Sequence, residues 1–199
     1  ACDNKSALIS NPDFPELLIF FSCVCMCNVK IILYLVFRLT MHLTFCYTMY
    51  IMKKQTIIFD VDGTIADVEH RRYHVTQQPT DWKAFKEATQ FDTPVQWVCD
   101  LAKKHIEDGH DVAFFSARNE SQRSLTEAQI DEWIGKGHQG LFLRPEGDYR
   151  PDEVFKSELA DKFEEFGGKI DLVYDDRNKV VAMWKARGIT VVQVAEGDF

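Results

Sequence analysis

Two acidic pairs each stand directly behind an apolar run in this 199-residue chain. The run "TIIF" leads into Asp60 and Asp62, and the run "IDLVY" leads into Asp175 and Asp176. Carboxylates this close together repel one another and resist desolvation, so the folded chain must give them partners. A hard divalent cation is such a partner, and a site of carboxylates that stays open to water and substrate suits Mg²⁺.

Other side chains in the same part of the chain can bind phosphate. The stretch "VAFFSAR" ends in Ser116 and Arg118, and Lys156 lies early in a predicted helix. Hydroxyl, lysine and arginine groups donate hydrogen bonds to phosphate oxygens. Gly63 permits a sharp turn behind the first acidic pair, and Thr64 adds a hydroxyl. A metal site with phosphate donors indicates phosphoryl transfer.

The elements that would position these groups alternate along the chain. From residue 55 onward, short β-rich runs alternate with amphipathic stretches, which predicts an α/β fold with a doubly wound parallel sheet and right-handed crossovers. In such a sheet the polar residues that follow the strands meet at one edge, where ligands bind. Strands are predicted at 56–59, 111–115, 141–143, 170–174 and 190–194, and helices at 94–109, 125–134, 151–166 and 179–186.

The first connection is longer than a strand-to-helix loop requires. It covers about residues 66–92, holds the cluster "HRRYH" and predicts one short helix at 81–88, so we expect a small cap over the ends of the strands. Thr93 and Pro94 then resemble a helix N-cap followed by proline at the first helical position. All tryptophans fall in predicted helices and are expected in the core: Trp82, Trp97, Trp133 and Trp184.

Charge and cysteine content divide the chain near residue 51. Residues 1–51 are apolar and carry three basic and three acidic residues, which leaves 20 basic and 28 acidic residues beyond them. Their apolar runs are too short and too interrupted to span a bilayer, so we favour upstream non-native sequence, with a start at Met49 or Met52, over a membrane anchor. Only Cys99 lies in the remaining domain, residues 52–199, which favours a reducing, cytoplasmic setting.

Residues 55–199 resemble a known family. "DVDGT", "FFSAR", Lys156 and "YDDR" are similar to the four motifs of the haloacid dehalogenase (HAD) superfamily of phosphatases. Within it, "RPDEVFK", "YDDRNKVVAMW" and "VVQVAEGDF" resemble the phosphatase half of the polynucleotide kinase/3′-phosphatases of phages. The resemblance implies a Rossmann-like HAD sheet with a cap inserted after the first strand.

The resemblance also implies a role for each motif residue. Asp60 would be the nucleophile that forms an aspartyl phosphate, and Asp62 the general acid and base. Ser116 and Lys156 would hold the phosphoryl oxygens. The implied Mg²⁺ ligands are Asp60, Asp175, Asp176 and, through its backbone carbonyl, Asp62. The expected substrate-binding residues are Arg71, Arg118, Asp152 and Thr64.

The leading hypothesis is a Mg²⁺-dependent phosphatase acting on the 3′-phosphate ends of DNA or RNA. A phosphatase for nucleotides or other small phosphoesters is the alternative, which the net charge of −8 favours slightly because surfaces that bind nucleic acid are usually basic. A non-catalytic nucleic-acid-binding module is disfavoured because every motif residue is present. No phosphate-cradling Gly-x-x-x-x-Gly-Lys-Ser/Thr loop occurs, so no kinase activity is expected. We expect neither an obligate protein partner nor a membrane.

Overall fold

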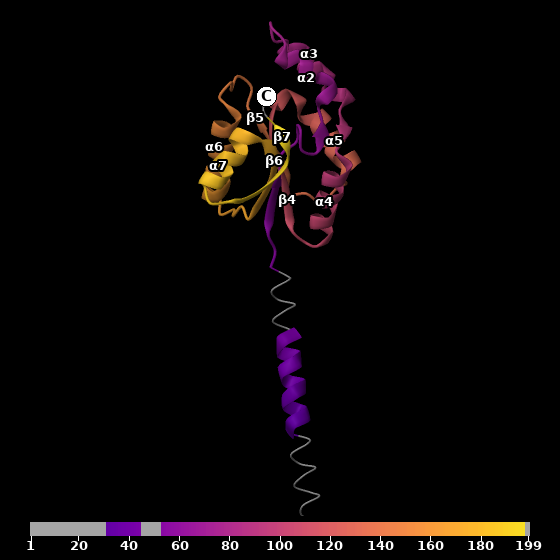
Figure 1. Cartoon of the computed structure of the whole chain (residues 1–199), viewed down its shortest axis with the longest axis vertical. Coiled ribbons are helices and arrows are strands. Elements are labelled where there is room, and N and C mark those ends of the chain that lie inside the picture. The colour runs from indigo at the N-terminus through magenta and orange to yellow at the C-terminus, as the bar shows by residue number, and fades with distance from the viewer. Residues whose placement is uncertain (1–30, 45–52, 198–199) are drawn as a thin grey trace, which may run out of the picture. The chain divides into compact units, whose positions relative to one another are not determined.

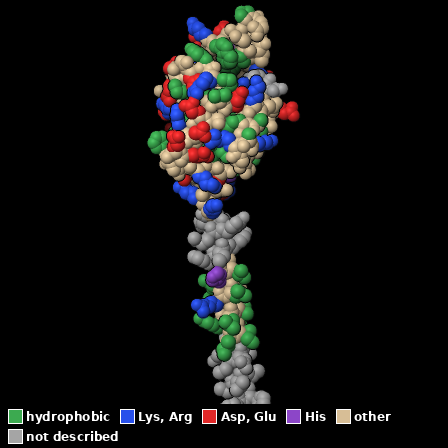
Figure 2. All heavy atoms as spheres, turned by 90° about the vertical axis from the view of Figure 1, so that its left-hand side faces the viewer, with side chains coloured by type: hydrophobic (Ala, Val, Ile, Leu, Met, Phe, Trp, Pro, Cys, Tyr) green, Lys and Arg blue, Asp and Glu red, His purple; other side chains and the backbone are tan. Residues whose placement is uncertain are grey.

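The computed structural model describes residues 31–44 and 53–197, in two units that divide at Lys53 and Lys54. In the first unit, residues 31–44 form a helix whose side chains are all exposed, and most side chains on the face visible in Figure 2 are hydrophobic, beside one basic side chain and one histidine. None of the helices within the described residues has the length and apolar character needed to cross a membrane. The expectation of non-native sequence at 1–51 falls mostly on residues 1–30 and 45–52, which lie outside the described ranges.

The second unit is built on a parallel sheet of five strands in the order β5-β4-β1-β6-β7. This arrangement confirms the predicted doubly wound fold. β1 has the predicted bounds, while β4 to β7 extend beyond their predicted carboxyl ends. The strands are β1 (Thr56–Phe59), β4 (Asp111–Asn119), β5 (Gly140–Arg144), β6 (Leu172–Arg177) and β7 (Thr190–Gly197).

Helices cover both faces of the sheet. α4 (Gln96–Glu107) and α5 (Arg123–Trp133) lie on one face, and α6 (Asp152–Glu165) and α7 (Asn178–Ala186) lie on the other (Figure 1). The alternation of side chains along β1 explains the two layers, because Ile57 and Phe59 pack with α4 and α5 whereas Ile58 packs with α6 and α7. Both faces of β1 are therefore buried, as its uninterrupted apolar sequence predicts.

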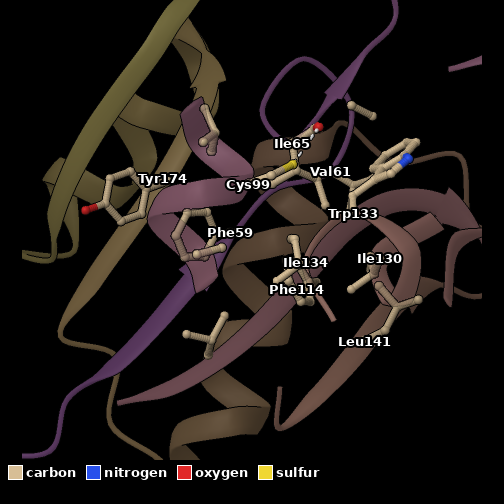
Figure 3. Close-up of a cluster of buried hydrophobic side chains, with 14 of the residues drawn as sticks. Phe59, Val61, Ile65, Cys99, Phe114, Ile130, Trp133, Ile134, Leu141 and Tyr174 are labelled. Carbon is tan, nitrogen blue, oxygen red and sulfur yellow. Dashed lines mark hydrogen bonds between the residues drawn. The ribbon is translucent and has the colours of Figure 1, made fainter. Parts of the chain in front are cut away.

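The core under the carboxyl end of β1 holds that end in place (Figure 3). Phe59 stacks on Tyr174 of the neighbouring β6 with ring centroids 4.5 Å apart. The carbonyl of Ile65 accepts hydrogen bonds from the Val95 N–H at 2.9 Å and from the Cys99 thiol at 3.5 Å. The loop that follows β1 is thus tied to the start of α4.

A cap of two helices stands between β1 and α4. It rests on a two-stranded antiparallel ribbon of β2 (Ala66–Asp67) and β3 (Thr93–Pro94). Between them lie α2 (Glu69–Thr76), α3 (Trp82–Glu87) and the 3₁₀ helix η1 (Ala88–Phe91). The prediction of a single helix in the cap was wrong, because the cap contains both α2 and α3. α2 escaped prediction because no side chain caps its N-terminus and its one buried residue is Arg71. Such a helix has no apolar stripe by which a sequence could reveal it.

Two further expectations were wrong. Thr93 and Pro94 form β3 instead of beginning α4, because they pair with β2, and Val95 becomes the N-cap residue. Trp133 and Trp184 are buried as predicted, but Trp82 and Trp97 are 59% and 54% exposed. Both exposed tryptophans lie in the first turn of their helices, α3 and α4.

Candidate active site

The carboxyl ends of β1 and β6 bring the two acidic pairs together. The strands pair with Phe59 opposite Tyr174, and the Asp60 N–H donates a hydrogen bond to the Tyr174 carbonyl at 2.9 Å. Gly63 follows with φ +83°, and a Cβ atom built on it would lie 2.3 Å from Oδ2 of Asp176. Only glycine fits there, because the turn needs a left-handed residue and the carboxylate needs the space.

Three buried carboxylates converge at this edge of the sheet. Oxygens of Asp60, Asp175 and Asp176 lie within 4.8 Å of one another. Burial raises the pKa of the Asp60 carboxyl well above its ordinary value, and the neighbouring carboxylates Asp175 and Asp176 add to that effect. Burial, and then the charge of Asp175, raise the pKa of Asp176 to about 6. The Lys156 ammonium acts in the opposite direction on Asp60 but does not outweigh burial, so the carboxylate cluster has less positive charge than it needs.

Lys156 is the cation that the chain itself provides to this cluster. Its Nζ donates hydrogen bonds to Oδ1 of Asp60 at 2.5 Å and to Oδ2 of Asp175 at 2.7 Å. Burial would lower the pKa of the Lys156 ammonium, but the charges of Asp175 and Asp60 outweigh burial and raise it. One ammonium against three carboxylates leaves a deficit, and Oδ1 of Asp176 is buried without a hydrogen-bond partner in the described part of the chain. Oxygen ligands with this deficit fit Mg²⁺.

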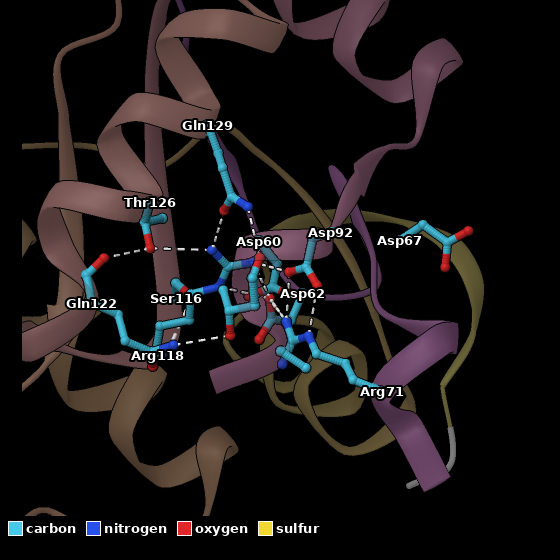
Figure 4. Close-up of polar contacts among 12 residues, drawn as sticks. Asp60, Asp62, Asp67, Arg71, Asp92, Ser116, Arg118, Gln122, Thr126 and Gln129 are labelled. Carbon is cyan, nitrogen blue, oxygen red and sulfur yellow. Dashed lines mark hydrogen bonds and ion pairs between the residues drawn. The ribbon is translucent and has the colours of Figure 1, made fainter. Parts of the chain in front are cut away.

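Asp62 points into a separate network of two arginines (Figure 4). Its Oδ1 accepts hydrogen bonds from Nη2 of Arg71 and from Nε of Arg118, both at 2.8 Å. Burial alone would raise the pKa of Asp62, but the guanidinium groups of Arg118 and Arg71 outweigh it and hold the pKa below its ordinary value. The Asp62 side chain is thus outside the carboxylate cluster, and the expected metal contact of its backbone carbonyl stays a prediction.

Asp92, at the end of the cap, is the second carboxylate of this network. It accepts from Nε and Nη2 of Arg71 at 2.7 and 2.8 Å, and from Nη2 of Arg118 at 2.7 Å. Arg118 is also held by Gln129 at 2.7 Å and by Thr126 at 3.2 Å. Both arginines are almost fully buried, so the structure positions them on carboxylates of the protein. The sequence analysis missed Asp92. The only signal for such a residue was that two arginines expected in one site need acidic partners.

The remaining expected residues surround these two groups. Ser116 lies in the second half of β4, buried, and its Oγ accepts from the Arg118 N–H at 3.2 Å. Thr64 is fully buried, and its hydroxyl has no partner among the described residues. Asp152, at the start of α6, accepts from the guanidinium groups of Arg144 and Arg177.

Asp152 is connected to the carboxylate cluster through one residue. The backbone N–H of Arg177 donates to Oδ1 of Asp175 at 3.1 Å, while its side chain binds Asp152. Arg144, which sequence reasoning also missed, lies over the Phe155 ring at 4.7 Å and donates to the Arg150 carbonyl at 2.6 Å. This connection fixes the start of α6, which carries Lys156.

Known structures share this fold. Two chains from Pnkp1/Rnl/Hen1 complexes, one described as an RNA repair complex, match with TM-scores of 0.58 and 0.61 at 26% identity. The match covers 73% of this chain and 44% and 47% of theirs, so this chain spans less than half their length. A phosphatase described as putative, from Clostridium difficile, matches with a TM-score of 0.51 at 13% identity over 73% of this chain and 86% of its own.

A family model also matches most of the chain. The model describes the phosphatase domain of the polynucleotide kinase PNKP, of HAD type, and it covers residues 54–199. That range contains both acidic pairs, the buried lysine and the arginine network. The chain therefore belongs to the family of HAD phosphatases typified by the PNKP phosphatase domain.

Proposed function

We propose that this protein is a Mg²⁺-dependent phosphomonoesterase that removes 3′-phosphates from polynucleotide ends through an aspartyl phosphate. The observation that carries the proposal is the buried group of Asp60, Asp175 and Asp176 around Lys156. The protein alone offers these carboxylates too little positive charge. A bound metal ion would supply positive charge, and the electrophilic phosphorus of a substrate would accept the electrons of one carboxylate.

Asp60 is the nucleophile in this proposal. Its carboxylate attacks phosphorus in line, the P–O bond to the 3′ carbon's oxygen breaks, and the phosphoryl group passes to Asp60. Lys156 holds the attacking carboxylate at 2.5 Å and offers its remaining donor capacity to a phosphoryl oxygen. Ser116, which is buried in the second half of β4, holds another phosphoryl oxygen.

Asp62 moves the proton. With two arginines on its Oδ1, it is a carboxylate at neutral pH, and this state suits the second step, in which it accepts the proton of the attacking water. To donate a proton to the leaving oxygen in the first step, it must first take one up. Substrate phosphates that draw Arg71 or Arg118 toward themselves would favour that uptake, because they remove positive charge from Asp62.

The metal ligands in this proposal are the carboxylates of Asp60, Asp175 and Asp176 and the backbone carbonyl of Asp62. Bound there, Mg²⁺ would neutralise charge that builds up on the phosphoryl oxygens. Carboxylate and carbonyl oxygens are the ligands that Mg²⁺ prefers. Oδ1 of Asp176 has no hydrogen-bond partner among the described residues, so it is available as a metal ligand.

The polynucleotide substrate rests on the family and on the arginines. The family is that of the polynucleotide kinase phosphatase domain, and one related chain belongs to a complex described as acting in RNA repair. Arg71 and Arg118 would exchange a carboxylate partner for a phosphate of the terminal nucleotide, and Asp152 and Thr64 are the other substrate-binding residues of this proposal. We propose no kinase activity, because the chain has no phosphate-cradling loop.

A small-molecule phosphatase is the second candidate, favoured by one observation. Arg71 and Arg118 are 1% and 4% exposed and already bound to Asp62 and Asp92, in a chain of net charge −8. A chain built to grip a polyanion usually presents a basic surface.

A substrate panel separates the two candidates. Phosphate release is followed from oligonucleotides with a 3′-phosphate, the same oligonucleotides with a 5′-phosphate, free nucleotides and sugar phosphates, at one salt and Mg²⁺ concentration. We expect the 3′-phosphorylated oligonucleotide to have the highest kcat/KM and the 5′-phosphate to remain. Higher values for free 5′-nucleotides would support the small-molecule reading instead.

A further inference from the structure

A cavity of about 220 Å³ opens beside the carboxylate cluster and has no part in the roles described above. Gly63, the residue after Asp62, lines it and lies against the Asp176 carboxylate. Much of the remaining wall is apolar, formed by Val68, Val95 and Val194. Its volume is below that of sites for drug-sized ligands, which are about 300–1,000 Å³, so it suits a single ring system.

Trp97 and Arg72 give this cavity planar groups. Trp97 is 54% exposed in the first turn of α4, although the next residues, Val98 and Cys99, are fully buried. Arg72 reaches the same cavity from α2 of the cap, where Glu69 holds its Nε at 3.2 Å. Indole rings and guanidinium groups are the side chains on which unpaired bases stack.

The acidic side chain in the wall does not oppose this use. Asp67 lines the cavity, and its Oδ1 already accepts the Glu69 N–H at 2.9 Å. Figure 4 shows Asp67 apart from the network around Asp62 and Arg118. A base carries no charge of its own, so the carboxylate repels only a phosphate placed against it.

We propose that this cavity binds an unpaired nucleobase near the 3′ end of the substrate strand, stacked on Trp97, with Arg72 next to the adjoining backbone phosphate. The inference rests on the polynucleotide function proposed above and adds a subsite to it. Stacking is tolerant of sequence because every base has a π-face, so the subsite would recognise single-stranded ends without selecting one base. It would favour polynucleotides over phosphoesters that have no base.

The test compares two exposed tryptophans. Trp97→Ala and the matched control Trp82→Ala, on α3 and outside the cavity wall, are measured on a 3′-phosphorylated oligonucleotide and on glycerol 2-phosphate, which has no ring. Loss of one base–aromatic stack predicts a fall of about tenfold or more in kcat/KM for the oligonucleotide in Trp97→Ala. Glycerol 2-phosphate turnover should be unchanged in both variants, and Trp97→Phe should restore most of the oligonucleotide activity.

Two further measurements locate the base. A series of oligonucleotides, each with one abasic position near the 3′ end, is measured with both proteins. At one abasic position the kcat/KM of the wild type should fall, whereas the kcat/KM of Trp97→Ala should not fall further at that position. Titration of Asp60→Asn with the 3′-phosphorylated oligonucleotide should quench tryptophan fluorescence, and the additional Trp97→Phe change should abolish that quenching.

The failures can be told apart. Equal losses on both substrates in Trp97→Ala would mean a structural role, and unchanged oligonucleotide activity would mean no stacking; each overturns the subsite and leaves the polynucleotide function intact. If the wild type hydrolyses glycerol 2-phosphate but no 3′-phosphorylated oligonucleotide, the proposed function is wrong, and the subsite with it.

Discussion

At the scale of single residues, Asp92 is the carboxylate on which both buried arginines depend. It makes three of the hydrogen bonds that fix Arg71 and Arg118, and its own side chain is fully buried. Asp92→Asn removes the charge with little change in volume, which leaves buried guanidinium groups short of a counter-charge. We expect a loss of about 3–5 kcal/mol in the free energy of unfolding, the usual cost of breaking a buried ion pair.

The same variant should reduce kcat/KM, because Arg71 and Arg118 would no longer hold Asp62 in position. Urea unfolding and steady-state kinetics are measured together, with Asp100→Asn, an exposed carboxylate on α4, as the matched control. Stability and activity equal to those of the wild type would mean that the network around Asp92 has no role in the site.

At the scale of elements, the turn after β1 depends on the close approach of Gly63 to Asp176. Gly63→Ala introduces a strained left-handed alanine and a Cβ atom 2.3 Å from Oδ2 of Asp176. Gly147→Ala is the matched control, since its φ of +79° is as strained but nothing lies within 4 Å of its Cβ. Left-handed backbone alone costs about 1–2 kcal/mol in either variant.

Only Gly63→Ala should also displace the Asp176 carboxylate. We therefore expect both variants to melt below the wild type, Gly63→Ala further than Gly147→Ala, and only Gly63→Ala to lose phosphatase activity. Thermal melts and phosphate release are the measurements. Similar activity in the two variants would contradict the claim that the tight turn at Gly63 positions the Asp176 carboxylate.

The end of α4 makes stability depend on pH. Burial, and then the charge of His110, lower the pKa of His105 below 6.5, with Asp108 acting in the opposite direction and Lys104 in the same one. Below about pH 6.5 the unfolded imidazole takes up a proton that the folded one resists, so the unfolded state binds more protons. This contribution to stability is complete above that pH and is lost as the pH falls through the lower folded pKa.

His105→Gln removes that titration while keeping a polar group that can face the Tyr174 hydroxyl, which lies 3.1 Å from Nε2 of His105. The free energy of unfolding at pH 5.5 and at pH 7.5 is compared for the two proteins. The wild type should lose more stability on acidification than His105→Gln. An equal or smaller loss in the wild type would show that His105 titrates normally in the folded protein.

How far the sequence predicts these elements depends on what buries them. β1 was predicted with its observed bounds, because a central parallel strand is apolar on both faces. α2 was not, because the residue it buries is Arg71, and a buried arginine is recognisable only from the carboxylates that pair with it. Thr93 and Pro94 have local helix-start chemistry, but pairing with Ala66 and Asp67 across the cap overrides it.

The candidate site shows the same limit. Asp60, Asp175 and Asp176 could be placed together because the ends of parallel strands meet at one edge of the sheet. That Arg71 and Arg118 bind Asp62 and Asp92 could not, because these contacts join the cap to the carboxyl-terminal ends of two strands, β1 and β4, and have no local pattern.

At the scale of the whole molecule, the described core and every candidate site residue lie in the unit from Lys54 to Phe199. We expect a protein that begins at Met52 to have the same kcat, KM and melting temperature as the full chain, because no described contact that forms the site involves the first unit. Both proteins are measured on the same 3′-phosphorylated oligonucleotide. Failure of the shorter protein to fold would mean that residues 1–51 are structural.

The most direct test of the proposed chemistry is to trap the phosphoryl group on the enzyme. An oligonucleotide with a labelled 3′-phosphate is mixed with the protein and Mg²⁺ and quenched in acid within one turnover, and the label that stays on the protein is measured. In a parallel sample the phosphorylated residue is identified by mass spectrometry, because borohydride reduces its acyl phosphate to an alcohol, with release of the phosphate, and so converts the aspartate to homoserine. We predict label on Asp60, none in Asp60→Asn, none with excess chelator, and none when the label is a 5′-phosphate. Phosphate release that proceeds at the wild-type rate in Asp60→Asn, or label on a different residue, would contradict the account.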